Sequence, residues 1–279
     1  NPIIITVSSS SFINSTTKEN GGAIHLINAG IKLDGVDFIN CSSQKGDGGG
    51  IFINNSVDVN SDIVIENIIF NECKAQCGSA IYVYSNSFIT HVSILFCNFT
   101  TNSALNSNDE NQFHYGGSAV FIAARTGIVS DCFFSNNKGE GGSMKIHNHF
   151  ESNNQVVNFF LDNEMDFVVK NCLFEIQKDS KCSLYYFRGD DGSKFELSNS
   201  VFTGDLPYRA RYIDGKAISI SSPKLFVDKC TFYDSFENSI NSANYYLLLD
   251  RANQMFIEKQ VVKIETGRKL SKNTWVLIA

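Results

Sequence analysis

The acidic side chains of the chain give weak support for catalysis. Asp34 and Glu66 each lie four residues before a recurring phenylalanine, which would place them side by side on one outer face. Hydrolysis of a polysaccharide needs at least two such carboxylates, and lyase chemistry needs a base beside a cation or a metal. The same position in later repeats holds Leu95, Ser130, Lys170 and Ser198. We therefore assign no catalytic residue and keep a polysaccharide lyase or glycoside hydrolase as the alternative function.

Metal and cofactor chemistry has equally little support. His147 and His149 would share one face of a strand, but a metal needs further ligands and none is evident nearby. The glycine-rich stretch 46–50 resembles one turn of a calcium-binding repeat, but it occurs once. We predict no metal site and no cofactor.

A row of outward aromatic side chains is the best candidate for a binding site. The row contains His25, Phe52, Tyr82, Phe121, Lys145 and Tyr185. Exposed aromatic rings in a row could form a flat platform for a protein or a glycan, with Phe52, Tyr82, Phe121 and Tyr185 as its members. The alternative is that a long loop, such as residues 101–115, folds over the rings.

The chain has eight cysteines and no Cys-x-x-Cys pair, which argues against zinc ribbons and thioredoxin-like chemistry. Cys97, Cys132 and Cys172 occupy one inward position in consecutive repeats, so we expect buried thiols there. Cys41 and Cys73 both lie three residues after the recurring phenylalanine. Their repeats are neighbours, so these two could also be bridged.

Four asparagines stand in Asn-x-Ser/Thr frames: Asn14, Asn40, Asn54 and Asn98. These frames are candidate glycosylation sites only if the source is eukaryotic and the chain is secreted.

All of these positions are defined by one repeat. Its anchor is a phenylalanine at positions 12, 38, 70, 99, 134, 174, 202 and 232. The residues seven and five places before the anchor are almost all apolar, which indicates a strand with one buried face. Three places before it stand mainly Gly, Asn, Asp and Ser, which suit a tight bend. A glycine-rich signal such as Gly21-Gly22-Ala23-Ile24 then begins a third strand.

A unit of three short strands cannot bury its own apolar face, but stacked units can. The sequence therefore predicts an all-β fold. It is a right-handed, single-stranded parallel β-helix of the pectin-lyase-like kind, with about eight coils of three strands joined by one tight bend and two looser turns. The helix should span residues 1–243. Residues 244–279 could be a ninth coil or a C-terminal cap.

The net charge of −6 and the lack of a basic stripe argue against nucleic-acid binding. No apolar run reaches the roughly 18 residues of a membrane helix. We expect the chain to be a segment of a longer protein whose membrane anchor lies outside it.

The ordered recurrence of two motifs resembles the polymorphic outer membrane protein (Pmp) repeat family. That family carries a Phe-x-x-Asn element, as at Phe99–Asn102 and Phe134–Asn137, followed by Gly-Gly-Ala-Ile, as at 21–24. The resemblance covers residues 1 to about 243. It implies a non-enzymatic, adhesin-like β-helix at a cell surface or outside the cell of an intracellular bacterium or a parasitic protist. Its expected partner is a host-cell protein or glycan.

Overall fold

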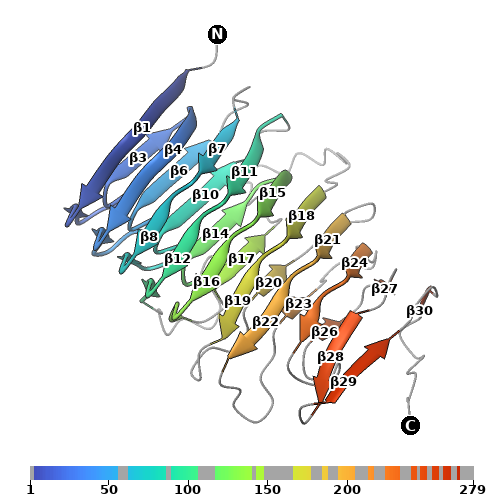
Figure 1. Ribbon diagram of the computed structural model, residues 1–279. Coiled ribbons are helices and arrows are strands. Elements are labelled where there is room, and N and C mark those ends of the chain that lie inside the picture. The colour runs from blue at the N-terminus through green and yellow to red at the C-terminus, as the bar shows by residue number, and fades with distance from the viewer. Residues whose placement is uncertain are drawn as a thin grey trace.

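The computed structural model describes the chain in segments. These are residues 3–55, 62–85, 89–105, 117–139, 143–147, 166–176, 184–187, 194–204, 213–216, 224–232, 240–243, 246–249, 253–257, 260–264 and 269–270. All the elements in them are β-strands, and they stack into a rod from the blue N-terminal coil to the red C-terminal strands of Figure 1. The chain is a parallel β-helix, as the repeat predicts.

The first two strands of each coil belong to one large sheet. In the first two coils they are continuous, as β1 (Ile4–Ile13) and β4 (Gly30–Ile39). The next six coils contain the pairs β7 (Ile63–Glu66) and β8 (Ile69–Asn71), β11 (His91–Leu95) and β12 (Asn98–Thr100), β15 (Thr126–Ser130) and β16 (Phe133–Ser135), β18 (Asp166–Lys170) and β19 (Leu173–Ile176), β21 (Lys194–Ser198) and β22 (Val201–Gly204), and β24 (Lys224–Asp228) and β25 (Thr231–Phe232).

The glycine-rich signals begin the strands of a second, eight-stranded parallel sheet. Its members are β3 (Ile24–Ile27), β6 (Ile51–Asn55), β10 (Ile81–Ser85), β14 (Val120–Ala123), β17 (Met144–His147), β20 (Leu184–Phe187), β23 (Ile213–Lys216) and β26 (Ile240–Ala243). Eight strands correspond to the eight expected coils. A third sheet of two-residue strands, which the sequence repeat does not predict, contains β2 (Thr16–Thr17), β5 (Ser42–Ser43), β9 (Lys74–Ala75) and β13 (Ser103–Ala104).

The register of the large sheet confirms the alignment of the repeats. Phe38 pairs with Phe12 on one side and with Phe70 on the other, and Phe99 pairs with Phe70 and Phe134. From Phe12 to Phe202 the rings stack with centroids 4.7–5.1 Å apart and interplanar angles of 4–14°. This spacing is the distance between hydrogen-bonded strands, so the stack follows directly from the parallel register.

Tight bends occur at three places in a coil rather than one. All eight residues three places before the phenylalanine have φ between 46° and 62°, which confirms the predicted bend. A second left-handed column follows two places after the phenylalanine, at Asn14, Asn40, Glu72, Thr101 and Asn136, with φ of 50–57°. A third consists of Gly21, Gly48, Gly78 and Gly117, which explains the first glycine of the third-strand signal. The connection from the second to the third strand thus contains two left-handed positions that the sequence analysis did not predict.

The C-terminal segment combines both alternatives that the sequence left open. β27 (Tyr246–Leu249) and β28 (Asn253–Ile257) continue the parallel ladder of β24 and β25 as part of a ninth coil. β29 (Gln260–Ile264) and β30 (Lys269–Leu270) then pair antiparallel with β28 and β27. They satisfy an edge that would otherwise present unpaired backbone groups, which is how a cap acts.

Candidate functional site

The outward aromatic row forms as predicted, but its rings are buried. Phe52 and Tyr82 stack with centroids 5.1 Å apart, and Tyr82 and Phe121 with centroids 4.8 Å apart. Phe52, Tyr82 and Phe121 are only 6%, 7% and 1% exposed, and they pack with Cys77 and Ala123 in a cluster separate from the main core. Burial also raises the pKa of Tyr82 well above its usual value.

A binding platform requires accessible rings, so the structure contradicts the exposure that this prediction assumed. The alternative of covered rings agrees with the burial, although residues 106–115 of the proposed covering loop lie outside the described residues. Tyr185 continues the row by pairing with Lys145, but its side chain is also outside the described part. His25, at the first coil, is exposed and meets Phe52 edge-on.

Two of the exposed large apolar side chains lie near the first bend of the fourth coil, apart from those of the first coil. Phe96 is 57% exposed and Ile69 is 43% exposed. Asn98 lies two residues after Phe96 and pairs with Ile69 on one side and with the half-buried Phe133 on the other. We call Ile69, Leu95, Phe96 and Phe133 the Phe96 patch.

The backbone explains why Phe96 is exposed. The residue has φ of 54°, and this bend turns its side chain away from the core, between the buried Ile94 and Cys97. Other coils place Ser, Gly, Asn, Asp or Lys at this position. The signal in the sequence is the phenylalanine itself, because this residue type is unusual where the backbone favours Gly or Asn. The pattern of inward apolar positions does not reveal it, because Phe96 lies outside those columns.

The Phe96 patch is bordered by polar groups. The coils on either side present Asn67 and Asp131 at the bend, and both are exposed. Asn67 donates a hydrogen bond of 2.8 Å to Asp34, and Asn171 donates one of 3.1 Å to Asp131. Exposed apolar side chains with a polar border are typical of an interaction site, and here the exposed Asn98 lies among them.

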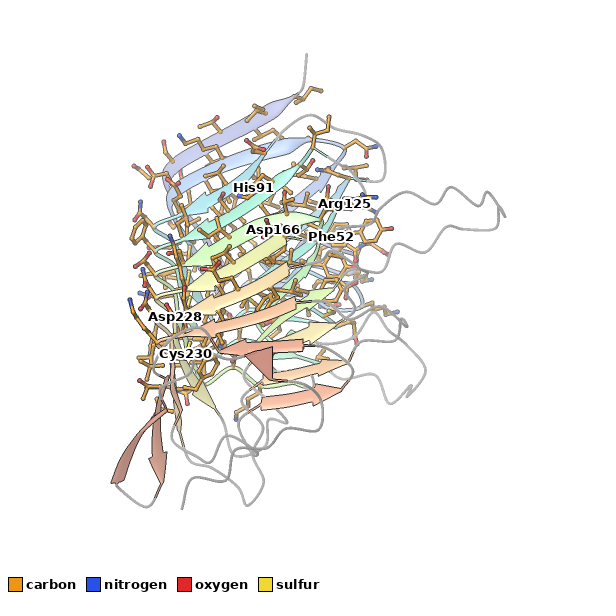
Figure 2. All side chains as sticks on the ribbon, turned by 90° about the vertical axis from the view of Figure 1, so that its right-hand side faces the viewer. Phe52, His91, Arg125, Asp166, Asp228 and Cys230 are labelled. Atoms are coloured by element: carbon orange, nitrogen blue, oxygen red, sulfur yellow. The ribbon has the colours of Figure 1, made fainter. Side chains whose placement is uncertain are left out.

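The patch and the aromatic row lie on opposite sides of the rod. In Figure 2, Phe52 is on the right, and Asp228 and Cys230 are on the left. Asp228 and Cys230 flank the bend residue that corresponds to Phe96 in the eighth coil. A partner on one face would therefore not contact the other.

The carboxylates remain an isolated pair. Asp34 and Glu66 are register partners across β4 and β7, as expected, and Leu95 follows Glu66 in the next coil. Within the described residues there is no group of three or more His, Cys, Asp or Glu side chains that could hold a metal ion. The side chain of His147 and all of His149 are outside the described part of the structure.

The four glycosylation candidates differ in accessibility. Asn14, Asn40 and Asn98 are exposed, whereas Asn54 is half-buried and its Oδ1 is enclosed without a hydrogen-bond partner. Asn40 donates a hydrogen bond of 2.7 Å to Asn14, so a glycan on Asn40 would break that contact. Asn98 lies at the centre of the Phe96 patch, so a glycan there would cover it.

The inward thiols form the expected ladder. Cys97, Cys132 and Cys172 are at most 3% exposed and are free thiols. Each Sγ points at a carbonyl of the preceding coil, with distances of 3.6, 3.6 and 3.8 Å to Ile65, Ile94 and Val129. Burial raises the pKa values of Cys132 and Cys172 well above that of an ordinary thiol.

A second buried column lies three residues after the phenylalanine in the second to fifth coils and contains Cys41, Cys73, Asn102 and Asn137. Each side chain donates to the carbonyl of the phenylalanine one coil earlier, over 3.3, 3.7, 3.1 and 2.9 Å in chain order. The two asparagines also accept from the backbone N–H of the preceding member, over 3.0 Å in both cases. Cys41 and Cys73 thus replace the donors of an asparagine ladder, and both are free thiols here.

Comparison of the chain with protein-family models, with curated proteins and with solved structures gave no match. The resemblance to the Pmp repeat therefore stays a prediction from the motifs. The part of the chain that the structure describes contains no helix with the length and hydropathy of a membrane span.

Proposed function

We propose that this chain is a non-enzymatic β-helix module, displayed at a cell surface or secreted, which binds a protein on another cell through the Phe96 patch. The observation that carries the proposal is the 57% exposure of Phe96 at a bend whose backbone favours Gly or Asn. Neither the conformation nor the solvation of this residue is favourable, so the fold gains nothing from a phenylalanine there.

The geometry of the patch supports a protein partner. Its four side chains are Ile, Leu and Phe on adjacent coils of a hydrogen-bonded sheet, so they are held rigidly before a partner arrives. Burial of such area contributes about 25 cal/mol per Å², and a preorganised surface loses little entropy on binding. The aliphatic members Ile69 and Leu95 pack against protein more readily than against the hydroxyl-rich surface of a glycan, so we favour protein over glycan.

The resemblance to the Pmp repeat supports the proposed location and the adhesin-like role, with a membrane anchor outside this segment. The isolated carboxylate pair gives no specific support to a polysaccharide-cleaving enzyme. The proposal needs no catalytic residue, no cofactor and no nucleic acid.

Flow cytometry with fluorescent chain on cultured epithelial cells tests this function. We expect Phe96→Asn combined with Ile69→Ser to reduce binding at least about tenfold while the β-sheet circular dichroism is kept. Ile27→Ser is the matched control, because Ile27 is 61% exposed on β3 of the first coil, away from the patch.

The same cells show whether the binding partner is a protein or a glycan. Mild protease treatment should abolish binding of the unmodified chain, whereas enzymatic removal of surface glycans should leave it intact. Undiminished binding by the double variant would overturn the patch assignment, and turnover of an acidic polysaccharide by the chain would overturn the non-enzymatic function.

A further inference from the structure

The border of the Phe96 patch carries charges that are mostly negative. Three of the four patch side chains have a carboxylate as their neighbour in an adjacent coil. These pairs are Leu95 with Glu66, Phe96 with Asp131, and Ile69 with Asp37. Asp131 is exposed, and the other two carboxylates belong to half-buried residues, so a partner on the patch would meet all three.

The columns around the first bend confirm this imbalance of charge. The columns that lie four, three and one places before the phenylalanine contain one lysine, Lys170, in the second to sixth coils. The same positions contain four carboxylates, at Asp34, Asp37, Glu66 and Asp131. Lys170 is separated from Leu95 by Ser130, whereas Glu66 pairs with Leu95 directly. The surface next to the apolar side chains is therefore acidic.

The carboxylate beside Phe96 is held in place by its neighbours. Asp131 accepts a hydrogen bond from the hydroxyl of Ser130 and another, of 3.1 Å, from the side-chain amide of Asn171. Its backbone N–H also donates to the carbonyl of Lys170 over 3.1 Å. The negative charge thus has a defined position relative to the phenylalanine ring before a partner binds.

An acidic border disfavours two kinds of partner. A second copy of the chain carries the same net charge of −6 and would bring its own carboxylates to the contact. A sulfated or sialylated glycan is also negatively charged. Like charges that meet across an interface weaken association, and opposite charges accelerate it.

We propose that the partner protein presents an apolar pocket for Phe96 with lysine or arginine side chains around its rim. This inference rests on the proposed binding function and names the chemistry of the partner at that same site. Contact with the apolar side chains holds the complex together, whereas the charges at the border mainly raise the rate of association. Salt screens such charges, so the association rate depends on ionic strength.

The probe for this test is plasma-membrane vesicles from the epithelial cells, captured on a biosensor surface. We expect the association rate constant of the full chain to fall at least about fivefold between about 50 mM and about 300 mM sodium chloride. Glu66→Gln should lower this rate constant about twofold and Glu66→Lys about tenfold, with little change in the dissociation rate. Glu19→Lys is the matched control, because Glu19 is exposed in the first coil and should leave the rate unchanged.

The possible results separate this inference from the binding function. If Phe96→Asn combined with Ile69→Ser abolishes binding, but salt and the Glu66 variants leave the association rate unchanged, the basic partner is overturned and the patch stands. Undiminished binding by that double variant overturns both. Faster association of Glu66→Lys would indicate an anionic glycan or a second copy as the partner, and would also overturn the inference.

Discussion

Phe96 has opposite effects on stability and on the proposed binding. A non-glycine side chain in the left-handed region is strained, and Asn tolerates this region better than Phe. We expect Phe96→Asn to raise the free energy of unfolding by about 0.5–1 kcal/mol in urea melts, although it weakens cell binding. A variant that is less stable than the wild type would show that Phe96 serves the fold.

Phe134 makes the opposite prediction, because it is fully buried in the phenylalanine stack. Phe134→Ala should lower the free energy of unfolding by about 3–5 kcal/mol, as for large buried side chains in general. The neighbouring Phe133→Ala is the control, since that half-buried ring points outward and should cost much less. A loss below about 1 kcal/mol at Phe134 would contradict the register.

The inward-pointing thiols of the main core should be unreactive in the folded chain. Burial raises the pKa of Cys230 from 9.0 to about 12, and the pKa values of Cys132 and Cys172 are also raised. We expect Ellman's reagent to react with none of these at pH 8 until denaturant is added. Between about pH 9 and pH 12 these thiols stay neutral in the folded chain but ionise in the unfolded chain. The free energy of unfolding should therefore fall as the pH rises through this range.

At the level of residues, the sequence predicted well which side chains point into the core and which point outward. It predicted poorly which of the outward side chains are accessible to solvent. The alternation within strands assigns Ile51 and Ile53 to the core and Phe52 to the outer side, and the main core cluster contains the first two only. Alternation cannot show whether another part of the chain covers an outward ring. This is why the sequence left open whether Phe52 is exposed or covered by a loop, and why Phe96 was not considered as a surface residue.

The bends are the elements that make one coil match the next. The second bend presents Asn102 to the interior, where it accepts from the N–H of Cys73 and donates to the carbonyl of Phe70. Asn102→Ala would leave both buried backbone groups without partners, and each such loss costs about 1–3 kcal/mol. We expect a total loss of at least about 2 kcal/mol in thermal or urea unfolding.

Asn98→Ala serves as the control for this measurement, because Asn98 is exposed on β12 in the same coil. Its free energy of unfolding should change by less than about 0.5 kcal/mol. Equal losses of unfolding free energy at Asn98 and Asn102 would mean that the hydrogen bonds of the asparagine ladder contribute no stability.

The strands and the first bend could be predicted because each has a side-chain signature that recurs at a fixed offset. The second bend could not, because its left-handed residues include Glu72 and Thr101, which carry no turn preference. There the hydrogen bonds between stacked coils impose the conformation. The two-residue strands of the third sheet were missed for a related reason, since no alternation is visible in two residues.

At the scale of the whole molecule, the parallel register turns a sequence repeat into straight rows of like side chains. Eight strands of the second sheet stack in chain order, so each row runs along the rod as a ladder. A departure from the repeat, such as a phenylalanine in a bend, then becomes a local surface feature on a regular scaffold. The binding proposal rests on one such departure.

Photo-cross-linking on intact cells tests the binding proposal most directly. Phe96 is replaced by photoreactive benzoylphenylalanine in one preparation, and the exposed His25 on β3 is replaced in a control preparation. After irradiation, we predict a covalent adduct with a cell-surface protein from position 96 and none from position 25. Adducts from position 25 alone, equal adducts from both, or none from position 96 while the chain remains bound would contradict the proposed binding surface.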